Sequence, residues 1–319
     1  MNIEKFISKC SNKQGAMQRN FGVTNEQFNL LVKQITPLWK ASEKKRLSSR
    51  ADRKRGIGAG HPYAFSTMRE KLAVILFYLK AYMTQELLGL MFEVDQSAIS
   101  RLLHKILPLI EAAADPELKI FLQKVQETCK KEKIKTLAEL TEKFPELREA
   151  QSDTTEQRCY RSSNYEKQKK YYSGKTKKHA VKTQITTSIT NRILDVSGSY
   201  PGSMHDKAII DEEKTIPKIP EQTPHRFDSG FQGVRNEYPN HYLILPIKKP
   251  KNGELSDLEK EHNTAHSRRR VKVEHGLSRL KKFKILANVF RNSIKVHNQV
   301  FRGIAAILNF RLANTVPVI

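Results

Sequence analysis

Apolar residues recur at helical spacing through the first third of the chain. Phe28, Leu31 and Ile35 follow this period, and Pro37 is expected to end or kink their helix. A second, strongly apolar helix is predicted to begin over Leu72 to Leu79. The N-terminal part of the chain is therefore predicted to be all-helical.

Two shorter helices joined by a turn follow. Thr84 is a favourable N-cap for a helix that runs to Phe92, and the turn Glu93-Val94-Asp95 leads into a second helix that begins with small polar residues. This arrangement is typical of a helix-turn-helix at about residues 84–106, within a DNA-binding domain of residues 1–110. An ordinary helical hairpin gives the same pattern. If the motif binds DNA, the side chains expected to face the groove are Gln96, Ser97, Ser100 and Arg101.

The period changes after a helical connector of mixed charge at residues 111–150. The segments that follow alternate or are rich in β-branched residues, which predicts strands, and one helix is expected between them at Met204–Ile210. An order of strands, helix, strands, helix predicts an α/β layer structure for residues 151–319. The expected strands are Asp153–Cys159, Val181–Thr190, Ile193–Tyr200, a segment ending at Phe231, and Tyr242–Ile247.

The segment Ser267–Lys284 is predicted to be a helix with an unusual charge distribution. From Arg268 to Lys284 it holds eight Lys or Arg residues and a single carboxylate, Glu274. At about 100° per residue, Arg270, Glu274 and Lys281 share one face. Glu274 could hold a divalent cation while the neighbouring bases hold phosphates. A solvated basic helix with an internal ion pair is the alternative.

The total charge favours a polyanionic partner. The formal net charge is +24 and the sequence pI is about 9.9, which indicates nucleic acid; a membrane surface is the alternative, although no run of apolar residues is long enough to span a bilayer. The three cysteines are scattered without metal-ligand spacing. Together these features predict a cytoplasmic, nucleoid-associated protein that binds double-stranded DNA.

Two stretches have the composition of nucleic-acid contacts. Lys40–Arg55 holds eight basic residues against two acids, and we interpret residues 40–62 as an arm that lies on the DNA backbone through Lys54 and Arg55. A plain solvated linker is nearly as good an explanation. Asn164–His179 is expected to be a loop in which lysines alternate with tyrosines, a composition that suits distorted or single-stranded DNA but also an ordinary hairpin tip.

Three carboxylates in separate segments could form a metal site. Asp153 and Asp228 lie beside predicted strands and Glu274 lies on the basic helix, so the three could converge on two metal ions, although each acid alone is more often a cap, turn or surface residue. Asp206 competes with Asp228 for the second position. It is expected in the first turn of a helix, where the dipole favours an acid and His205 could be its partner, whereas Asp228 has no obvious cation beside it.

These motifs together resemble a known family. From about Arg55 to Phe310 the chain resembles DDE-type bacterial insertion-sequence transposases of the Harbinger-like group. Lys281 stands seven positions after Glu274, as in that family, whereas Ser267 replaces its usual tyrosine. The resemblance rests on the motifs Asp153-Thr154-Thr155-Glu156, Pro201-Gly202-Ser203-Met204-His205-Asp206, Asp228-Ser229-Gly230-Phe231-Gln232-Gly233 and Arg270-Val271-Lys272-Val273-Glu274.

The resemblance implies a fold and a chemistry. The fold would be an RNase H-like catalytic core, a mixed sheet with flanking helices, preceded by the all-α helix-turn-helix domain. Asp153, Asp228 and Glu274 would hold two Mg2+ or Mn2+ ions, with Arg270 and Lys281 on the phosphates and Asp206 in a supporting or alternative role. The activity would be cut-and-paste transposition by a homodimer or higher oligomer acting on element ends and target DNA. A DNA-binding regulator, an inactive relic and a hydrolysis-only endonuclease are the alternatives.

Overall fold

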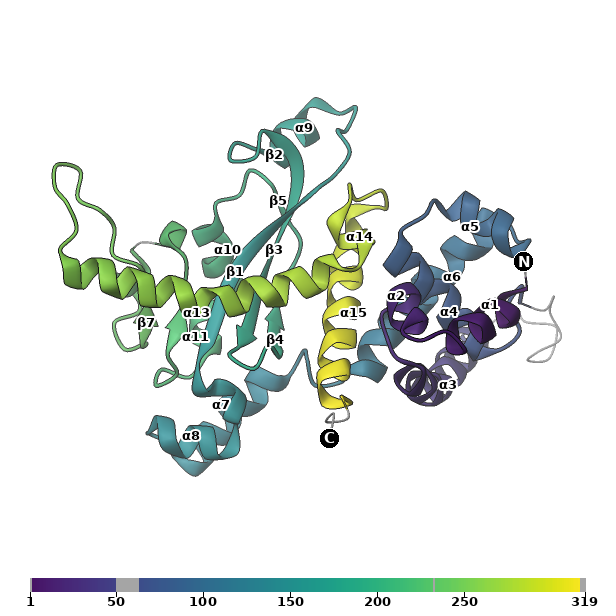
Figure 1. Cartoon of the computed structure of the whole chain (residues 1–319), viewed down its shortest axis with the longest axis horizontal. Coiled ribbons are helices and arrows are strands. Elements are labelled where there is room, and N and C mark those ends of the chain that lie inside the picture. The colour runs from purple at the N-terminus through teal and green to yellow at the C-terminus, as the bar shows by residue number, and fades with distance from the viewer. Residues whose placement is uncertain (1, 50–62, 232, 316–319) are drawn as a thin grey trace. The chain divides into compact units, whose positions relative to one another are not determined.

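The computed structural model describes residues 2–49, 63–231 and 233–315, apart from the side chains of residues 272, 273 and 275 (Figure 1). Lys54 and Arg55, the predicted backbone contacts of the arm, lie outside the described residues. Contacts divide the chain into two compact units. The helical unit comprises Met1–Pro116, Lys281–Asn288 and Gln299–Ile319, and the sheet unit comprises Glu117–Leu280 and Val289–Asn298.

These units do not follow the order of the chain. The connector at residues 117–150 groups with the strands, whereas most of the last helix groups with the N-terminal helices. Polar contacts between distant residues tie the C-terminal helix to the helical unit: Arg302 Nε donates to Glu111 at 2.8 Å and Asn309 Nδ2 donates to Asp115 at 2.7 Å. The chain order alone therefore does not define the units, because packing joins segments from both ends.

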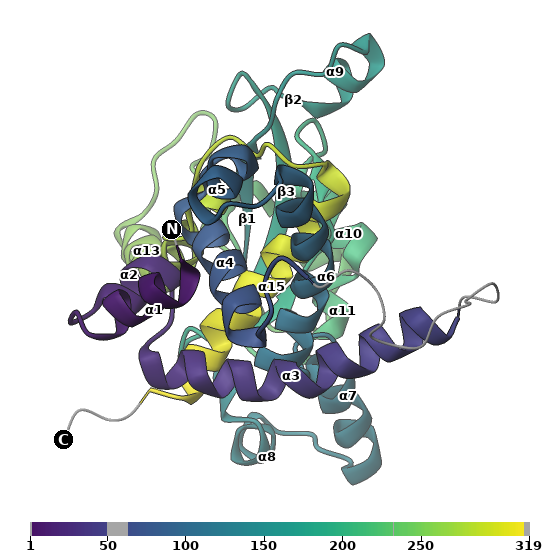
Figure 2. The ribbon, with the colours of Figure 1, turned by 90° about the vertical axis from the view of Figure 1, so that its right-hand side faces the viewer.

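The helical unit is built around α4, whose residues from Leu72 to Leu79 are all buried. A helix that is apolar on every side must be covered on every side, and α1, α2, α3, α6 and α14 all pack against it (Figure 2). The helices of this unit are α1 (Ile3–Ser11), α2 (Ala16–Phe21), α3 (Asn25–Ser48), α4 (Met68–Ala81), α5 (Gln85–Phe92), α6 (Gln96–Ala114), α14 (Lys284–Ala287) and the part of α15 (Ile294–Ala313) from Gln299 onward.

Threonine caps fix where three of these helices begin. Thr24 and Thr67 form capping boxes at the starts of α3 and α4, and Thr84 accepts from Leu87 N at the start of α5, as predicted. Such a cap stabilises a helix by about 1 kcal/mol. Of the two effects expected of Pro37, to end or to kink its helix, the first is wrong, because α3 continues through Pro37 to Ser48.

The predicted helix-turn-helix forms from α5 and α6. Glu93 ends α5 in the left-handed conformation, with φ of 58°, and Val94 N donates to Gly89 O at 2.9 Å. The turn approaches α5 so closely that a Cβ atom on Gly89 would lie 2.5 Å from Val94 O. Only glycine fits this position without a shift of backbone.

The sheet unit contains a mixed sheet in the strand order β2-β3-β1-β6-β7. β1 is antiparallel to β3 and parallel to β6, and β6 is parallel to β7. This sheet with flanking helices, together with the all-helical N-terminal region, confirms the predicted fold class. The strands are β1 (Ala150–Arg158), β2 (Tyr172–Ser173), β3 (Lys178–Ser188), β4 (Ile193–Val196), β5 (Tyr200–Pro201), β6 (His225–Arg226) and β7 (Leu243–Ile244).

The side chains of β1 alternate between two differently covered faces of the sheet. On one face Gln184 of β3 bonds to Thr215 and Lys182 bonds to Asp206, so short helices cover it. On the other face α13 passes over β1 (Figure 1), and a Cβ atom added to Gly276 would lie 3.8 Å from Thr187 Cγ2. The flanking helices are α7 (Phe121–Glu132), α8 (Leu137–Lys143), α9 (Tyr165–Tyr171), α10 (Asp206–Glu213), α11 (Thr215–Lys218), α12 (Val234–Glu237) and α13 (Asp257–Lys281), with 3-10 turns η1 (Pro145–Arg148) and η2 (Ser229–Phe231).

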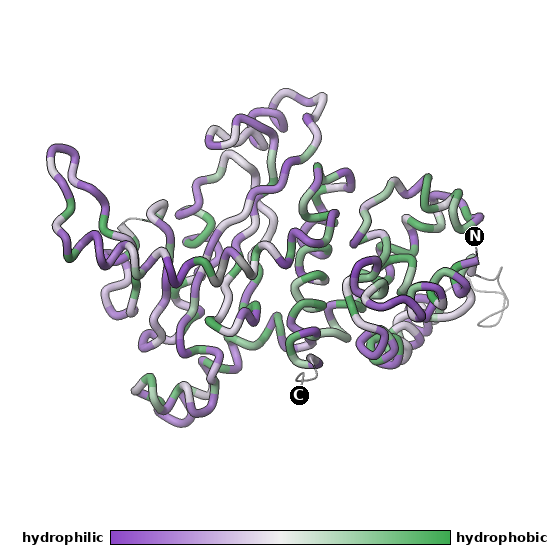
Figure 3. Tube along the Cα trace, in the orientation of Figure 1, coloured by the Kyte–Doolittle hydropathy of each residue, from purple (hydrophilic) through white to green (hydrophobic). Residues whose placement is uncertain are grey.

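Two predicted segments differ in the structure. The segment at residues 164–179, expected to be a loop, contains α9 and β2 instead, because Asn164 accepts from Lys167 N and so caps a helix. The helix expected at residues 267–284 begins ten residues earlier, at Asp257, and its polar composition is visible along α13 (Figure 3). Among the described residues, no helix is long and apolar enough to cross a membrane.

The close approach at Gly89 leads to a stability prediction. Gly89→Ala should lower the free energy of unfolding by about 1–3 kcal/mol, because its methyl group would overlap the Val94 carbonyl. Gly303→Ala in α15 is the matched control, since a Cβ atom there would meet its neighbours at an ordinary 3.9 Å and alanine favours helix. Urea unfolding followed by circular dichroism measures both variants. Equal stability of the two would contradict this account of the turn.

Candidate active site

The register of β1 and β6 brings Asp153 and Asp228 together. β6 is parallel to β1, with Ala150 opposite His225 and Gln151 opposite Arg226. The same offset, continued two residues further, sets Asp228 beside Asp153. Alternation then directs both carboxylates toward the face that α13 covers. Asp153 is the fourth residue of β1 rather than its first, and Asp228 lies between β6 and η2.

A single guanidinium from α13 lies between these two carboxylates. Arg270 Nη1 donates to Asp228 Oδ1 at 2.8 Å, and its Nη2 lies 3.5 Å from Asp153 Oδ2. The expectation that Asp228 has no cation beside it was therefore wrong. Sequence could not show this pairing, because Arg270 and Asp228 are far apart in the chain.

The pKa of Asp153 is raised above its usual value, mainly by burial. Burial raises the pKa of Asp153, and the nearby carboxylates of Asp228 and Asp206 raise it further, while the positive charge of Arg270 opposes the shift. Two acids that share one cation form a set of hard oxygen donors, which is what Mg2+ or Mn2+ prefers. Asp153 and Asp228 thus fit a divalent metal site.

A second ion-pair cluster next to the site anchors α13. Arg269 Nη1 donates to Glu149 Oε2 at 2.8 Å, and Arg226 Nε donates to the other oxygen of the same carboxylate at 3.0 Å. Glu149 and Arg226 are buried. Burial alone would raise the pKa of Glu149, but the two arginines lower it below its usual value. Adjacent arginines of one helix therefore bind three carboxylates of the sheet unit: Arg269 binds Glu149, and Arg270 pairs with Asp153 and Asp228.

Sequence reasoning missed Glu149, Arg226 and Arg269. Nothing in their spacing separates them from surface charges, since Glu149 simply precedes a strand and Arg269 lies in a run of arginines. Only the strand register brings Arg226 beside Gln151 and so next to Glu149.

Glu274 lies one helical turn beyond Arg270 on α13, as predicted, with an exposed side chain. Among the described residues, no three His, Cys, Asp or Glu side chains form a group that could hold a metal ion. The structure therefore brings Asp153 and Asp228 together and leaves Glu274 outside that pair. Lys281 is the last residue of α13 and groups with the helical unit.

Asp206 is tied to the opposite face of the sheet. It lies in the first turn of α10, as expected, and its Oδ1 accepts from Lys182 Nζ at 2.8 Å. Lys182 is buried and lies 3.5 Å from Glu156, its cross-strand neighbour on that face. His205 does not pair with Asp206 as expected, because its ring accepts from Lys207 N and caps the helix. Asp206 thus has a structural role of its own.

The side chains predicted to face a DNA groove lie on the outer side of α6. Gln96, Ser97 and Arg101 are exposed and Ser100 is partly exposed, and Gln96 Nε2 donates to Gln85 Oε1 at 2.7 Å. The side chains predicted to face the core, Ile99, Leu102 and Leu103, are buried.

Comparisons with known proteins identify similar families and a similar protein. Residues 152–309 match the DDE superfamily endonuclease family, and residues 67–116 match the helix-turn-helix of DDE superfamily endonuclease. The chain is 29% identical to the "Probable transposase for insertion sequence element IS702" of Microchaete diplosiphon over 98% of this chain and 99% of that protein. No solved structure matches the chain.

The buried cluster at Glu149 generates a pH-dependent prediction. Glu149→Gln should lower the free energy of unfolding by about 3–5 kcal/mol at pH 7, because it leaves the Arg226 charge buried without its partner. Since the folded-state pKa of Glu149 is depressed, this contribution is present above about pH 4.3, the value of an unperturbed glutamate, and is lost as pH falls through the lower folded value.

Chemical denaturation of both proteins between neutral and acidic pH tests this dependence. Glu261→Gln, on an exposed position of α13, is the control and should leave stability nearly unchanged. A Glu149→Gln effect that stays constant into strong acid would show that the lost packing, rather than the charge, is responsible.

Proposed function

Since the chain belongs to the DDE-type insertion-sequence transposases with an N-terminal helix-turn-helix, we propose that it cuts DNA at the ends of its element and joins the freed ends to target DNA. The observation that best supports this is the register that places Asp153 beside Asp228 on the face covered by α13. A sheet with only a structural role would gain nothing from two acids on neighbouring parallel strands, because their charges repel each other.

We assign the metal ligands to Asp153, Asp228 and Glu274, with two Mg2+ or Mn2+ ions. Ions held by such carboxylates activate water or a DNA 3′-hydroxyl for in-line attack on phosphorus and stabilise the leaving oxygen. Asp153 and Asp228 are already adjacent, and Glu274 would complete the set from α13. Asp206 would act on the site only through its charge, since Lys182 holds it on the other face.

In this proposal Arg270 has two roles. In the structure it balances the charge of Asp153 and Asp228. If bound metal ions balanced those charges instead, the Arg270 guanidinium would be free to donate bidentately to a phosphate of the DNA backbone. Lys281 would hold a further phosphate.

Recognition of the element ends would be carried by α6. Gln96, Ser97, Ser100 and Arg101 would contact base edges in the major groove, while Lys54 and Arg55 would hold the backbone. Two ends must be cut and joined together, so a homodimer or higher oligomer bound to DNA in the nucleoid is proposed.

The metal-ligand assignment predicts a separation of binding from cutting. Asp153→Asn, Asp228→Asn and Glu274→Gln should each abolish cleavage of a supercoiled plasmid carrying the element while leaving gel-shift binding of its ends intact. Glu212→Gln, at an exposed position of α10, is the control and should keep cleavage activity. Any of the three variants that still cuts at a near-normal rate in Mg2+ would be removed from the ligand set. Cleavage without joined products would identify a hydrolytic endonuclease instead.

The shared guanidinium predicts opposite effects on metal binding and on catalysis. Arg270→Gln should tighten Mn2+ binding by about tenfold or more, because the competing charge is removed, and should slow cleavage because a phosphate contact is lost. Calorimetric titration with Mn2+ in the absence of DNA measures the first effect. Arg268→Gln, at an exposed position two residues earlier, controls for the general loss of charge. Weaker Mn2+ binding by Arg270→Gln than by Arg268→Gln would refute the competition.

A further inference from the structure

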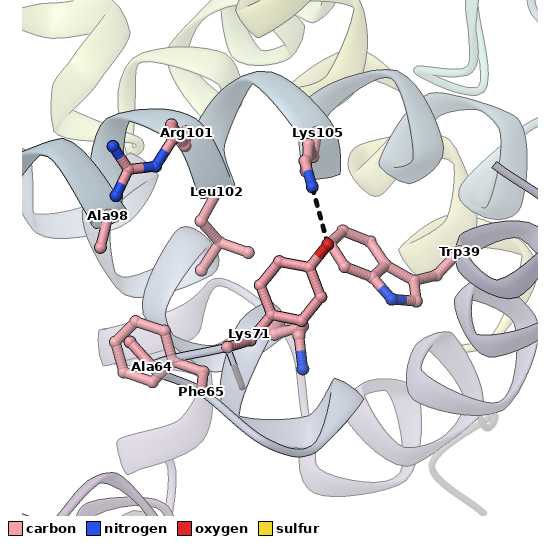
Figure 4. A pocket seen from close by; sticks show the side chains of 9 residues that line it. Trp39, Ala64, Phe65, Lys71, Ala98, Arg101, Leu102 and Lys105 are labelled. Atoms are coloured by element: carbon pink, nitrogen blue, oxygen red, sulfur yellow. Dashed lines mark hydrogen bonds between the residues drawn. The ribbon is translucent and has the colours of Figure 1, made fainter. Parts of the chain in front are cut away.

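A small aromatic pocket opens beside α6 within the helical unit (Figure 4). Its volume is about 90 Å³, and its lining comes from α3, from the segment before α4, from α4 itself and from α6. The lining residues that matter below are Trp39, Tyr63, Phe65, Lys71, Arg101 and Lys105.

The walls of the pocket are mostly aromatic. The rings of Trp39 and Tyr63 meet edge to face, with centroids 5.8 Å apart and planes at 71°. Phe65 is buried, whereas Tyr63 is 46% exposed, so part of its ring surface remains accessible. Partly exposed aromatic side chains that are held in place can stack on the flat face of a nucleobase.

The same pocket carries an excess of positive charge. Lys71 is only 3% exposed, yet its ammonium donates to the backbone oxygens of Ser66 and Thr67 rather than to a carboxylate. Lys105 Nζ lies 4.8 Å from the centre of the Tyr63 ring and donates to Glu43 Oε1 at 3.0 Å.

The charges do not balance within the pocket. Arg101 adds a third cation to Lys71 and Lys105, and the nearby carboxylates are those of Glu43, which also bonds to Arg46, and Glu70, which belongs to the capping box of α4. A buried lysine without a carboxylate partner, in a cavity with surplus cations, favours an anionic ligand.

We propose that this pocket binds one unstacked nucleotide of the DNA that α6 contacts. The base would stack on the partly exposed ring of Tyr63, which Trp39 meets edge to face, and its phosphate would lie against Arg101 and Lys105. Arg101 carries the argument for DNA over a free metabolite, because it belongs both to the pocket and to the exposed face of α6. Recognition of an intact duplex needs no such pocket, so the pocket would add a nucleotide contact to the proposed recognition of the element ends. This contact does not depend on the cleavage chemistry.

Trp39 provides a direct readout, because it is the sole tryptophan of the chain. The full-length protein is titrated with an oligothymidylate of about ten nucleotides, and with an abasic strand of equal length that has the same phosphates and no bases. The oligothymidylate should quench Trp39 emission by stacking, and the abasic strand should leave the emission unchanged. Equal quenching by both strands, or by inorganic phosphate, would reduce the site to a phosphate contact and overturn the proposal, as would no quenching at all.

Matched variants locate the effect in the pocket. Tyr63→Ala removes the exposed ring and should weaken the quenching transition about tenfold, whereas Tyr63→Phe keeps the ring and should behave as the unmodified protein. Lys105→Gln should also weaken it, and Lys33→Gln, at an exposed position of α3, is the charge control. Unchanged circular dichroism establishes that each variant is folded. If Tyr63→Ala retained full quenching, or if Lys33→Gln lost as much as Lys105→Gln, the pocket would not be the binding site.

Discussion

The sharing of one guanidinium between Asp153 and Asp228 is the interaction on which the sheet unit depends. Two carboxylates side by side repel each other, and the repulsion grows as water is excluded. Without a cation, burial and the neighbouring carboxylate would raise the pKa of Asp153 unopposed by any positive charge. Arg270 provides that cation from a helix and so links the charge of the site to the position of α13. Arg269, bound to Glu149, holds the same helix at a neighbouring point.

The alternation of β1 assigns different tasks to the two faces of the sheet. Odd-numbered positions carry Glu149, Asp153 and Gln157 toward one side, where arginines and His297 meet them. Even-numbered positions carry Ser152 and Glu156 toward the other side, where polar networks are closed within the protein. Lys182 of β3 lies opposite Glu156 and holds Asp206 on the second face. Asp228 lies on the first face, together with Asp153 and Arg270.

Local patterns in the sequence predicted the elements well and their pairing poorly. The helix-turn-helix was predictable because its features are local. The cap at Thr84, the turn and the buried positions of α6 each depend on residues within about one helical turn. Asp153 and Asp228 were singled out through family motifs and their nearness to strands. Their common cation, Arg270, was known as a basic residue but not as their partner. Lys182 was not foreseen at all, because its role depends on a cross-strand register that spacing does not determine.

The last helix, α15, completes the core of the helical unit. Gln27, near the start of α3, donates to the backbone oxygens of Arg311 and Asn314 at 3.5 and 3.2 Å, and α15 buries Val300, Ile304 and Ile307. During synthesis the N-terminal helices must therefore wait for α15 before their core is complete. A chain cut short before α15 would lack part of its helical unit as well as the missing segment. In the function proposed above, such a fragment could not occupy DNA as an intact competitor of the full chain.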